Sequence, residues 1–535
     1  MRDGINRQFS SLQPQMTKQE GGIAFLMFAI FAVLFCHFQL VTASAHHLDS
    51  AFLMETLTSI KHTGVPTTYI GQSFSDGMGI LTLNAVTVCQ SALAPTAHPI
   101  NIFDVHAYFF LYPLAVLTWL FSPLAILAVA NGLSFVSVIF IVYWVIRKKG
   151  VPALGAVAFC LLVMLHPAWS HASLGDFYVD RFFMPLGLLY ACLLYDAIFQ
   201  QGYINRNNLS LVLFIGLLAA STTERGAIMI AFFTIGSLIL YRKKITDSGA
   251  RNILIIFSIS LVLYVLLYLK LLYVGHPGSA KLTSLLQAVP YFFEYLRTPV
   301  YAAQVQEFVI INVLLFGFFA LFEWRLAIIA CVTLLPNLLT TIGGAEKNGW
   351  GTHYHSMYFP FLIFASAIGF SKLWCSLGCT KYRLLLIGLL LALVPAISSY
   401  SPGYGRQHGA VKRLYDFYAN GSQSSENSLA DQLHQIAVVV PSGAKVTTLE
   451  GFMPVLYYGR TIYFYPVGID VADYAVLTRV NQANGSFYYT GAVSYLPGET
   501  QKVDICLNDR LKKAGYNLEK PRFLLGSMAV LERKK

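Results

Sequence analysis

Charged side chains are scarce in this chain: only 12% of its 535 residues are Asp, Glu, Lys or Arg, whereas 56% are hydrophobic. It also lacks an internal repeat and a low-complexity tract, which excludes a solenoid and a disordered polar protein. The mean hydropathy of +0.59 is far above that of soluble proteins. This composition predicts a polytopic membrane protein.

The basic residues do not form one patch, although the formal net charge is +11. They separate apolar segments instead of alternating with exposed aromatics, which argues against nucleic-acid binding. This pattern indicates that the basic residues set the orientation of the chain in the membrane. The cysteines are scattered, and the one close pair, Cys375 and Cys379, lacks the further ligands that a zinc site requires.

Apolar runs of bilayer length predict about eleven transmembrane helices. They begin near residues 22, 123, 151, 182, 209, 226, 252, 308, 325, 356 and 383. With this count, the basic segments fall on one side of the membrane, namely Arg2, Arg7, Lys18, 147–150, 241–244, Arg251, 371–375 and 380–383. The positive-inside rule then places the N-terminus in the cytoplasm and the C-terminus outside a multi-pass protein of the inner (plasma) membrane.

The expected organisation has three parts: a cytoplasmic tail (1–21), a transmembrane domain (22–400) and an outer domain (401–535). "VTASA" at 41–45 resembles a signal-peptidase site, but the preceding apolar stretch is too long, so we expect a retained first helix. Short β-branched and aromatic runs after residue 400 predict a small α/β domain. The fold class is therefore membrane all-α with a C-terminal α/β domain.

The first outer loop, 43–122, is expected to contain interfacial helices. "HLDSAFLMETLTSIKHTG" at 47–64 has apolar residues at helical spacing and is predicted to lie on the membrane and to end at Gly64. The segment 106–121 is too short and too interrupted by Pro113 for a confident span, so it is expected to be interfacial or re-entrant.

Acidic residues and histidines gather on the predicted outer face. They are Asp49, Glu55, Asp76, Asp104, Asp176, Asp180, Glu224, His353 and His355. Arg181 and Arg225 also lie at outer helix ends, where the positive-inside rule disfavours basic residues. Charged groups at such positions usually mark a pathway or a site.

Several ordered stretches lie within residues 104–477, namely "DVHAYFFLYPLAVL", "GDFYVDRFFMPLGLLYA", "TTERGAIMIAF", "HYHSMYFPFLIFASAIG" and "VVPSGAKVTTLEGFMPVLYYGRTIYFYP" followed by "ADYAVL". With these stretches, the order of the features above resembles the GT-C superfamily of membrane glycosyltransferases and, more narrowly, the family called domain of unknown function 2079. The GT-C likeness implies that Asp49, just after the first helix, is a base or metal ligand, supported by Asp176 and Asp180 in the second outer loop.

The resemblance implies transfer of a sugar from a polyprenyl-phosphate donor to a saccharide, lipid or protein acceptor. A carboxylate would deprotonate the acceptor hydroxyl, and a guanidinium would bind the leaving phosphate. Arg181 and Arg225 are the candidates for the phosphate, with Glu224, His106, His353 and His355 as further substrate-binding candidates. A divalent metal, Mg²⁺ or Mn²⁺, held by Asp49 and Asp176 is a possible cofactor.

Each candidate could also have a purely structural role instead of a functional one. Asp49 could cap the helix that follows it, and Asp176 and Asp180 could belong to a solvated loop at a helix start. Glu224 and Arg225 could neutralise each other, and the histidines could be packing residues or interfacial anchors.

Two other functions compete with an enzyme. A transporter or lipid flippase would need inverted repeats and ionisable residues near the bilayer centre, whereas here the charges lie at helix ends. A non-catalytic envelope assembly or sensing protein would use the outer domain to bind a partner.

Overall fold

The computed structural model describes residues 18–42, 48–81, 84–170, 177–200, 206–245, 247–275, 297–338, 354–400, 410–421, 425–482, 486–490 and 500–534. It divides into two compact units. The helical unit comprises residues 1–36, 106–110 and 130–415, and the mixed unit comprises 37–105, 111–129 and 416–535. Apart from 106–110, the residues predicted as the first outer loop therefore share a unit with the C-terminal segment.

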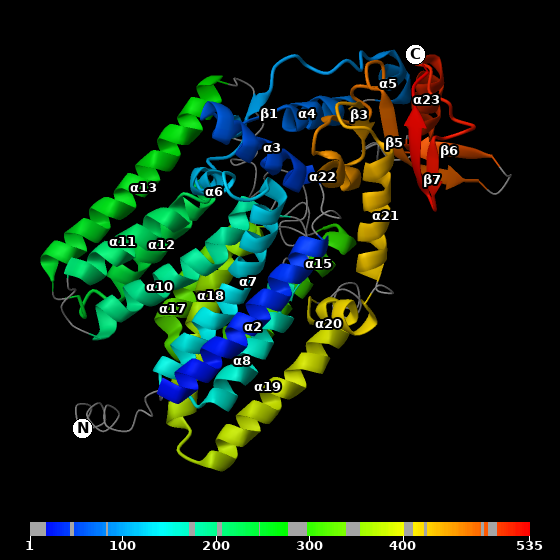
Figure 1. Cartoon of the computed structure of the whole chain (residues 1–535). Coiled ribbons are helices and arrows are strands. Elements are labelled where there is room, and N and C mark those ends of the chain that lie inside the picture. The colour runs from blue at the N-terminus through cyan, green and yellow to red at the C-terminus, as the bar shows by residue number, and fades with distance from the viewer. Residues whose placement is uncertain are drawn as a thin grey trace. The chain divides into compact units, whose positions relative to one another are not determined.

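The helical unit is built from apolar helices (Figure 1). They are α2 (Lys18–Thr42), α7 (Pro123–Lys148), α8 (Ala153–Leu165), α9 (Pro167–Ser170), η4 (Val179–Phe182), α10 (Phe183–Gln200), α11 (Arg206–Ala220), α12 (Glu224–Leu240), α13 (Ser248–Gly275), α15 (Pro299–Asn312), η5 (Val313–Gly317), α16 (Phe318–Ala320), η6 (Leu321–Glu323), α17 (Trp324–Leu338), α18 (His355–Ser376), α19 (Thr380–Tyr400) and α20 (Ala410–Asn420). Parts of α2, α7 and α20 extend into the mixed unit.

Six helical segments of the described chain are long and apolar enough to cross a membrane. They are Gln19–Thr42, Pro123–Lys148, Val179–Ile198, Ser248–Leu272, Val305–Leu335 and His355–Ser376. The predicted count of about eleven is not confirmed. The other predicted segments do form helices, but α8, α11 and α12 have only 13, 15 and 17 residues.

The membrane helices differ in how much protein surrounds them. In α18, 78% of an 18-residue apolar segment is buried inside the protein, compared with 17% of such a segment in α2 and 22% in α13. Helix α18 is therefore central to the unit, whereas α2 and α13 present apolar side chains to their surroundings, as lipid-facing helices do.

Helices α10, α12 and α18 run in the same direction. Glu323 accepts hydrogen bonds from Tyr241 Oη at 2.6 Å and from Lys372, so the C-terminal ends of α12 and α18 meet there. Nearer the opposite ends, the rings of Phe233 in α12 and Phe361 in α18 stack at 4.7 Å. Helix α10 is aligned with α12, because Tyr190 Oη lies 2.6 Å from Thr234 Oγ1 and the Tyr195 and Tyr241 rings are 6.2 Å apart.

The run Val305–Leu335 contains the two helices that the sequence predicts near residues 308 and 325. The first lies alongside α18 and runs in the same direction. Between ring centroids, Phe308 is 5.6 Å from Tyr358 and Phe319 is 5.5 Å from Phe370. The second returns along α12, from Arg325 beside Tyr241 to Ile329 against Gly236. The chain thus reverses at the 3₁₀ turn η6.

The mixed unit combines short helices with a sheet (Figure 1). Its elements are α3 (Leu48–Thr63), β1 (Thr67–Thr68), α4 (Tyr69–Leu81), α5 (Ala85–Gln90), β2 (Ile100–Asn101), η2 (Ile102–Asp104), α6 (Leu111–Leu117), α21 (Ser425–Val439), β3 (Lys445–Thr448), η8 (Glu450–Phe452), α22 (Met453–Leu456), β4 (Thr461–Phe464), β5 (Tyr474–Asn481), β6 (Phe487–Thr490), α23 (Thr500–Lys513), β7 (Phe523–Leu525) and β8 (Met528–Glu532). The predicted strands after residue 400 are confirmed.

The main sheet has the strand order β4-β3-β5-β8-β7, with β6 paired to β5. Strand β3 is parallel to β4 and β5, whereas β8 is antiparallel to β5 and β7. Strand β5 supplies the buried centre, since Ala475, Val476 and Leu477 have no exposed surface. A disulfide between Cys89 in α5 and Cys506 in α23 joins residues that are 417 positions apart.

Protein covers the apolar residues of the helix predicted at 47–64, and its location on the membrane stays a prediction. Ala51, Met54 and Leu57 of α3 are completely buried, and α3 packs against α4, α6, β1 and α22. The predicted end of this helix is confirmed: Gly64 has φ of +74° and donates its N–H to Ile60 O at 2.9 Å. Helix α6 has only seven residues, too few to span a bilayer.

Candidate functional site

Several predicted site residues converge at one end of the helical unit. We call the group formed by His106, Asp180, Arg181, Glu224, Arg225 and Tyr354 the polar cluster. Asp49 lies in the mixed unit, in the first turn of α3. Asp176 and His353 lie outside the described residues.

The polar cluster is built on helix starts. Asp180 and Arg181 lie in η4 directly before α10, Glu224 and Arg225 open α12, and Tyr354 precedes α18. Because α10, α12 and α18 run in the same direction, their N-termini share one end of the unit. Helix N-termini carry partial positive charge and free N–H groups, which favour anions.

His106 and Glu224 form a hydrogen-bonded pair between residues 118 positions apart. The Nδ1 atom of His106 lies 3.0 Å from Glu224 Oε1. Glu224 Oε2 accepts hydrogen bonds from Ala107 N and Thr223 Oγ1, both at 3.1 Å. An imidazole that donates from Nδ1 to a carboxylate carries its lone pair on Nε2. Glu224 therefore orients the imidazole, and His106 has the arrangement of a general base.

The imidazole and its backbone are held from other directions as well. The His106 and Tyr108 rings stack with centroids 4.9 Å apart. Phe110 N donates to Ser221 O at 2.9 Å, which ties segment 106–110 to the end of α11. The position of His106 thus depends on the loop before α12, and the 20% exposure of its side chain leaves a path to the ring.

Arg225 is the cation best placed to bind an anion. Its guanidinium carbon lies 4.3 Å from the centroid of the Tyr354 ring, and its charge interacts with Asp180 and Glu224. Its buried Nη1 atom has no hydrogen-bond partner among the described residues. A guanidinium held by a ring face keeps its N–H groups available for oxygen acceptors.

Asp180 and Arg181 are more deeply buried than loop residues would be. Asp180 has no exposed surface and Arg181 is 3% exposed. The Arg181 guanidinium lies over the rings of Tyr178, at 5.2 Å, and Phe135, at 5.9 Å. Such burial suits residues that position the cluster, since a buried carboxylate beside Arg225 compensates its charge.

His355 belongs to a buried polar group whose other members, Tyr358 and His166, were not predicted from the sequence. Its Nδ1 lies 3.0 Å from Tyr358 Oη, and its charge interacts with His166, which follows α8 and has no exposed surface. His166 accepts the N–H of Ala168 at 3.1 Å. His166 lies next to Pro167 at the end of an apolar run, and this sequence position was the only signal that could have identified it.

The metal site predicted for Asp49 and Asp176 is not tested, because Asp176 lies outside the described residues. No group of three or more His, Cys, Asp or Glu side chains in the described segments is arranged to hold a metal ion. Glu224, the most accessible carboxylate of the polar cluster, already receives three hydrogen bonds. The described donors therefore do not fit a divalent cation, and no step is assigned to one.

Comparison with known proteins identifies a family. A family model described as "Predicted membrane protein (DUF2079)" matches residues 71–484. No curated protein matches the sequence. Among solved structures, ArnT from Cupriavidus metallidurans bound to undecaprenyl phosphate is similar with a TM-score of 0.43 and 11% identity, over 82% of this chain and 85% of that chain. An oligosaccharyltransferase from Archaeoglobus fulgidus, tethered to an acceptor peptide, is similar with a TM-score of 0.33 and 12% identity, over 85% and 77%.

Proposed function

The chain belongs to the DUF2079 family of predicted membrane proteins, and we propose that it is an integral-membrane glycosyltransferase that uses a polyprenyl-phosphate sugar donor. The observation that carries the proposal is the half-buried Arg225 at a shared end of three apolar helices, because its Nη1 atom is buried and has no hydrogen-bond partner among the described residues. A lipid phosphate would arrive at such a place with its tail in hydrocarbon and its head in water.

Arg225 would bind the phosphate that leaves the sugar. Its Nη1 atom is free to donate, and the N-termini of α10, α12 and α18 add favourable partial charge. Negative charge on the phosphate grows as the glycosidic C–O bond breaks, so these donors stabilise the transition state more than the bound donor.

His106 would act as the general base. Its Nε2 atom would accept the proton of the acceptor hydroxyl while that oxygen bonds to the anomeric carbon and the phosphate departs with the bonding electrons. Glu224 holds the imidazole and stabilises the imidazolium that forms. Asp49, Asp176 and Asp180 remain the carboxylates proposed from the sequence, and the burial of Asp180 favours a positioning role.

We place this chemistry on the outer face of the inner membrane. The opposite helix ends carry the ion pairs Arg147–Glu20, Lys148–Asp196 and Lys372–Glu323, as the positive-inside rule expects of a cytoplasmic side. The disulfide of the mixed unit supports an outer location for the C-terminal segment, because disulfides persist in oxidising compartments. The acceptor would be a saccharide, lipid or protein that reaches this face.

The proposal is tested by replacing Arg225 in purified protein reconstituted into lipid. The probes are polyprenyl-phosphate-linked glucose, mannose and N-acetylglucosamine with labelled sugars, incubated with envelope extract as acceptor. We expect Arg225→Lys to lower the rate of transfer about 10²-fold, because the ammonium group of lysine cannot reproduce the paired N–H donors of a planar guanidinium.

Arg251→Lys, at an exposed position of α13, is the matched control and should transfer at the parental rate. Equal rates for Arg225→Lys and the parent, or no transfer from any of the three donors by the parent, would contradict the proposal.

A further inference from the structure

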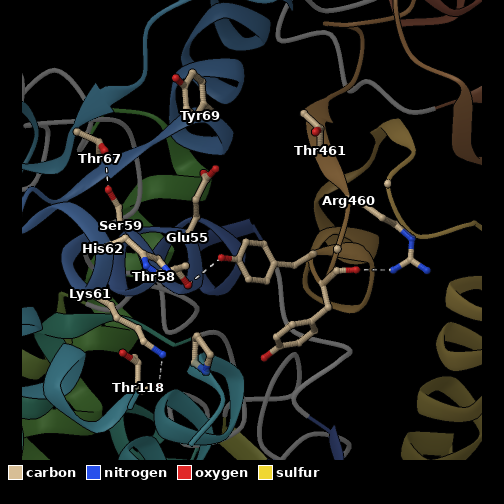
Figure 2. A pocket seen from close by; sticks show the side chains of 15 residues that line it. Glu55, Thr58, Ser59, Lys61, His62, Thr67, Tyr69, Thr118, Arg460 and Thr461 are labelled. Atoms are coloured by element: carbon tan, nitrogen blue, oxygen red, sulfur yellow. Dashed lines mark hydrogen bonds between the residues drawn. The ribbon is translucent and has the colours of Figure 1, made fainter. Parts of the chain in front are cut away.

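An open pocket of about 660 Å³ lies entirely within the mixed unit. Figure 2 shows Glu55, Thr58 and Lys61 of α3 on one wall, with Arg460 and Thr461 on another. Tyr457 connects these walls, since its hydroxyl lies 2.9 Å from Thr58 Oγ1. Its size matches small-molecule sites.

Both basic side chains with permanent charge in this pocket are already bonded to the protein. Lys61 Nζ donates to Thr118 O at 2.9 Å and lies 5.0 Å from the centroid of the Trp119 ring. Arg460 donates to the carbonyl oxygens of Val440, at 3.1 Å, and Tyr458, at 2.9 Å. A phosphate or carboxylate ligand would therefore find little uncommitted positive charge.

The remaining lining groups suit a neutral ligand with many hydroxyls. The rings of Tyr69 and Tyr458 are 50% and 43% exposed, so their faces are accessible. Glu55 accepts hydrogen bonds through Oε2 from Thr68 Oγ1 at 2.6 Å and Ile70 N at 2.8 Å. Burial raises the pKa of its carboxyl, against the opposing effect of these hydrogen bonds.

An extended peptide is a poorer fit, although Thr461 begins the edge strand β4. The outward N–H of Phe464 in β4 donates to Ser73 Oγ of α4 at 2.7 Å. A Cβ atom on Gly77 would lie 2.4 Å from the Phe464 ring, so α4 is closely seated on this edge. A peptide therefore cannot add a strand along β4.

The pocket adjoins the start of a membrane helix. Pro123, one of its lining residues, begins α7. The residues just before it, Trp119, Leu120 and Phe121, are 70%, 77% and 60% exposed, as aromatic and apolar residues at a membrane surface are. A ligand here would be presented at the height of the lipid head groups.

We propose that this pocket binds a saccharide at the membrane surface, stacked on Tyr458 and hydrogen-bonded by His62 and Glu55. The inference deepens the proposed function by assigning a sugar-binding subsite outside the polar cluster. The sugar would belong to the lipid-linked donor or to a glycan acceptor, which share this chemistry.

Saturation-transfer NMR on the full-length protein in nanodiscs tests the subsite with D-glucose, D-mannose, D-galactose and N-acetyl-D-glucosamine. We expect at least one sugar to bind, and Tyr458→Ala and His62→Ala to weaken its binding about five- to tenfold through loss of an aromatic face or a hydrogen bond. Both side chains are exposed, so neither belongs to the core, and the unfolding temperature of each variant reports whether it folds.

Tyr415→Ala, at a 69% exposed tyrosine of α20, is the matched control and should bind as the parent does. Absence of binding for all four sugars, or parental binding in folded Tyr458→Ala and His62→Ala, would overturn the inference. Arg225→Lys separates the two proposals, because it should keep sugar binding while losing transfer. Competition by polyprenyl-phosphate sugar assigns the subsite to the donor, and its absence assigns the subsite to the acceptor glycan.

Discussion

Charged residues with little exposed surface in this protein differ in how their environment compensates their charge. Glu224 receives hydrogen bonds from His106, Ala107 and Thr223, so it remains a useful acceptor for an imidazole. Asp504 of α23 is 2% exposed, and its Oδ1 has no hydrogen-bond partner in the described part of the chain. The first environment suits catalysis, whereas the second makes the folded state sensitive to pH.

The pH dependence of the mixed unit should contain a contribution from Asp504. Burial raises the pKa of this carboxyl to about 7 from 3.8, although a hydrogen bond from Thr490 opposes the shift. The folded state therefore binds the proton more tightly, and this contribution to stability is lost as the pH rises from about 4 to about 7. Asp504→Asn should raise the unfolding temperature at pH 8 and change it little at pH 4.

Scanning fluorimetry of the full-length protein at pH 4, 6 and 8 measures the effect. Asp509→Asn, at an exposed position of the same helix, is the control and should follow the parent at each pH. A difference between Asp504→Asn and the parent that does not grow with pH would contradict the assignment.

At the scale of elements, close helix packing depends on small residues around α18. A Cβ atom on Gly369 would lie 1.9 Å from the backbone oxygen of Phe319. Ser366 Oγ also donates to Phe316 O at 2.7 Å, in the π-helical segment η5. These contacts hold α18 against η5 and α16, as small and hydroxylated residues do between membrane helices.

Gly369→Ala should destabilise the helical unit by about 1 to 3 kcal/mol, because the backbone of α16 must move to admit a methyl group. Gly388→Ala is the matched control, since a Cβ atom there meets nothing within 4 Å. The control should be neutral or slightly stabilising through higher helix propensity. Thermal unfolding followed by size-exclusion chromatography in detergent compares the two, and equal midpoints would refute the packing argument.

At the scale of the whole molecule, the mixed unit is assembled from segments far apart in the chain. Residues 37–105 and 111–129 join 416–535 in one compact unit. Arg510 of α23 donates to Ser91 O at 3.2 Å beside the Cys89–Cys506 disulfide. The cross-link and these contacts connect the early segment to the C-terminal one across an interval of membrane helices.

Removing this cross-link should lower stability by about 2 to 4 kcal/mol, because a disulfide that closes a long loop restricts the unfolded chain. Cys89→Ser with Cys506→Ser should therefore unfold at a lower temperature than the parent, and dithiothreitol should lower the parent's temperature to the same value. Cys379→Ser, at an exposed free cysteine, should have no effect. A parental unfolding temperature in the double variant would argue against the disulfide.

The amino-acid sequence was sufficient for features that depend on neighbouring residues. Apolar runs located α2, α7, α10, α13 and α18, and the glycine at position 64 marked the end of α3. It also predicted which charged residues stand at helix starts, including Arg225. These predictions succeed because hydropathy, chain reversal at glycine and the cost of charge near lipid are local properties.

Only the tertiary structure decided which distant residues meet. It paired His106 with Glu224, covered α3 with protein, placed Arg225 over Tyr354 and joined Cys89 to Cys506. No periodicity encodes these relations, because each depends on how several helices and strands pack at once. By itself the sequence therefore determined where charge enters an apolar protein, and packing determined which of those charges can act together.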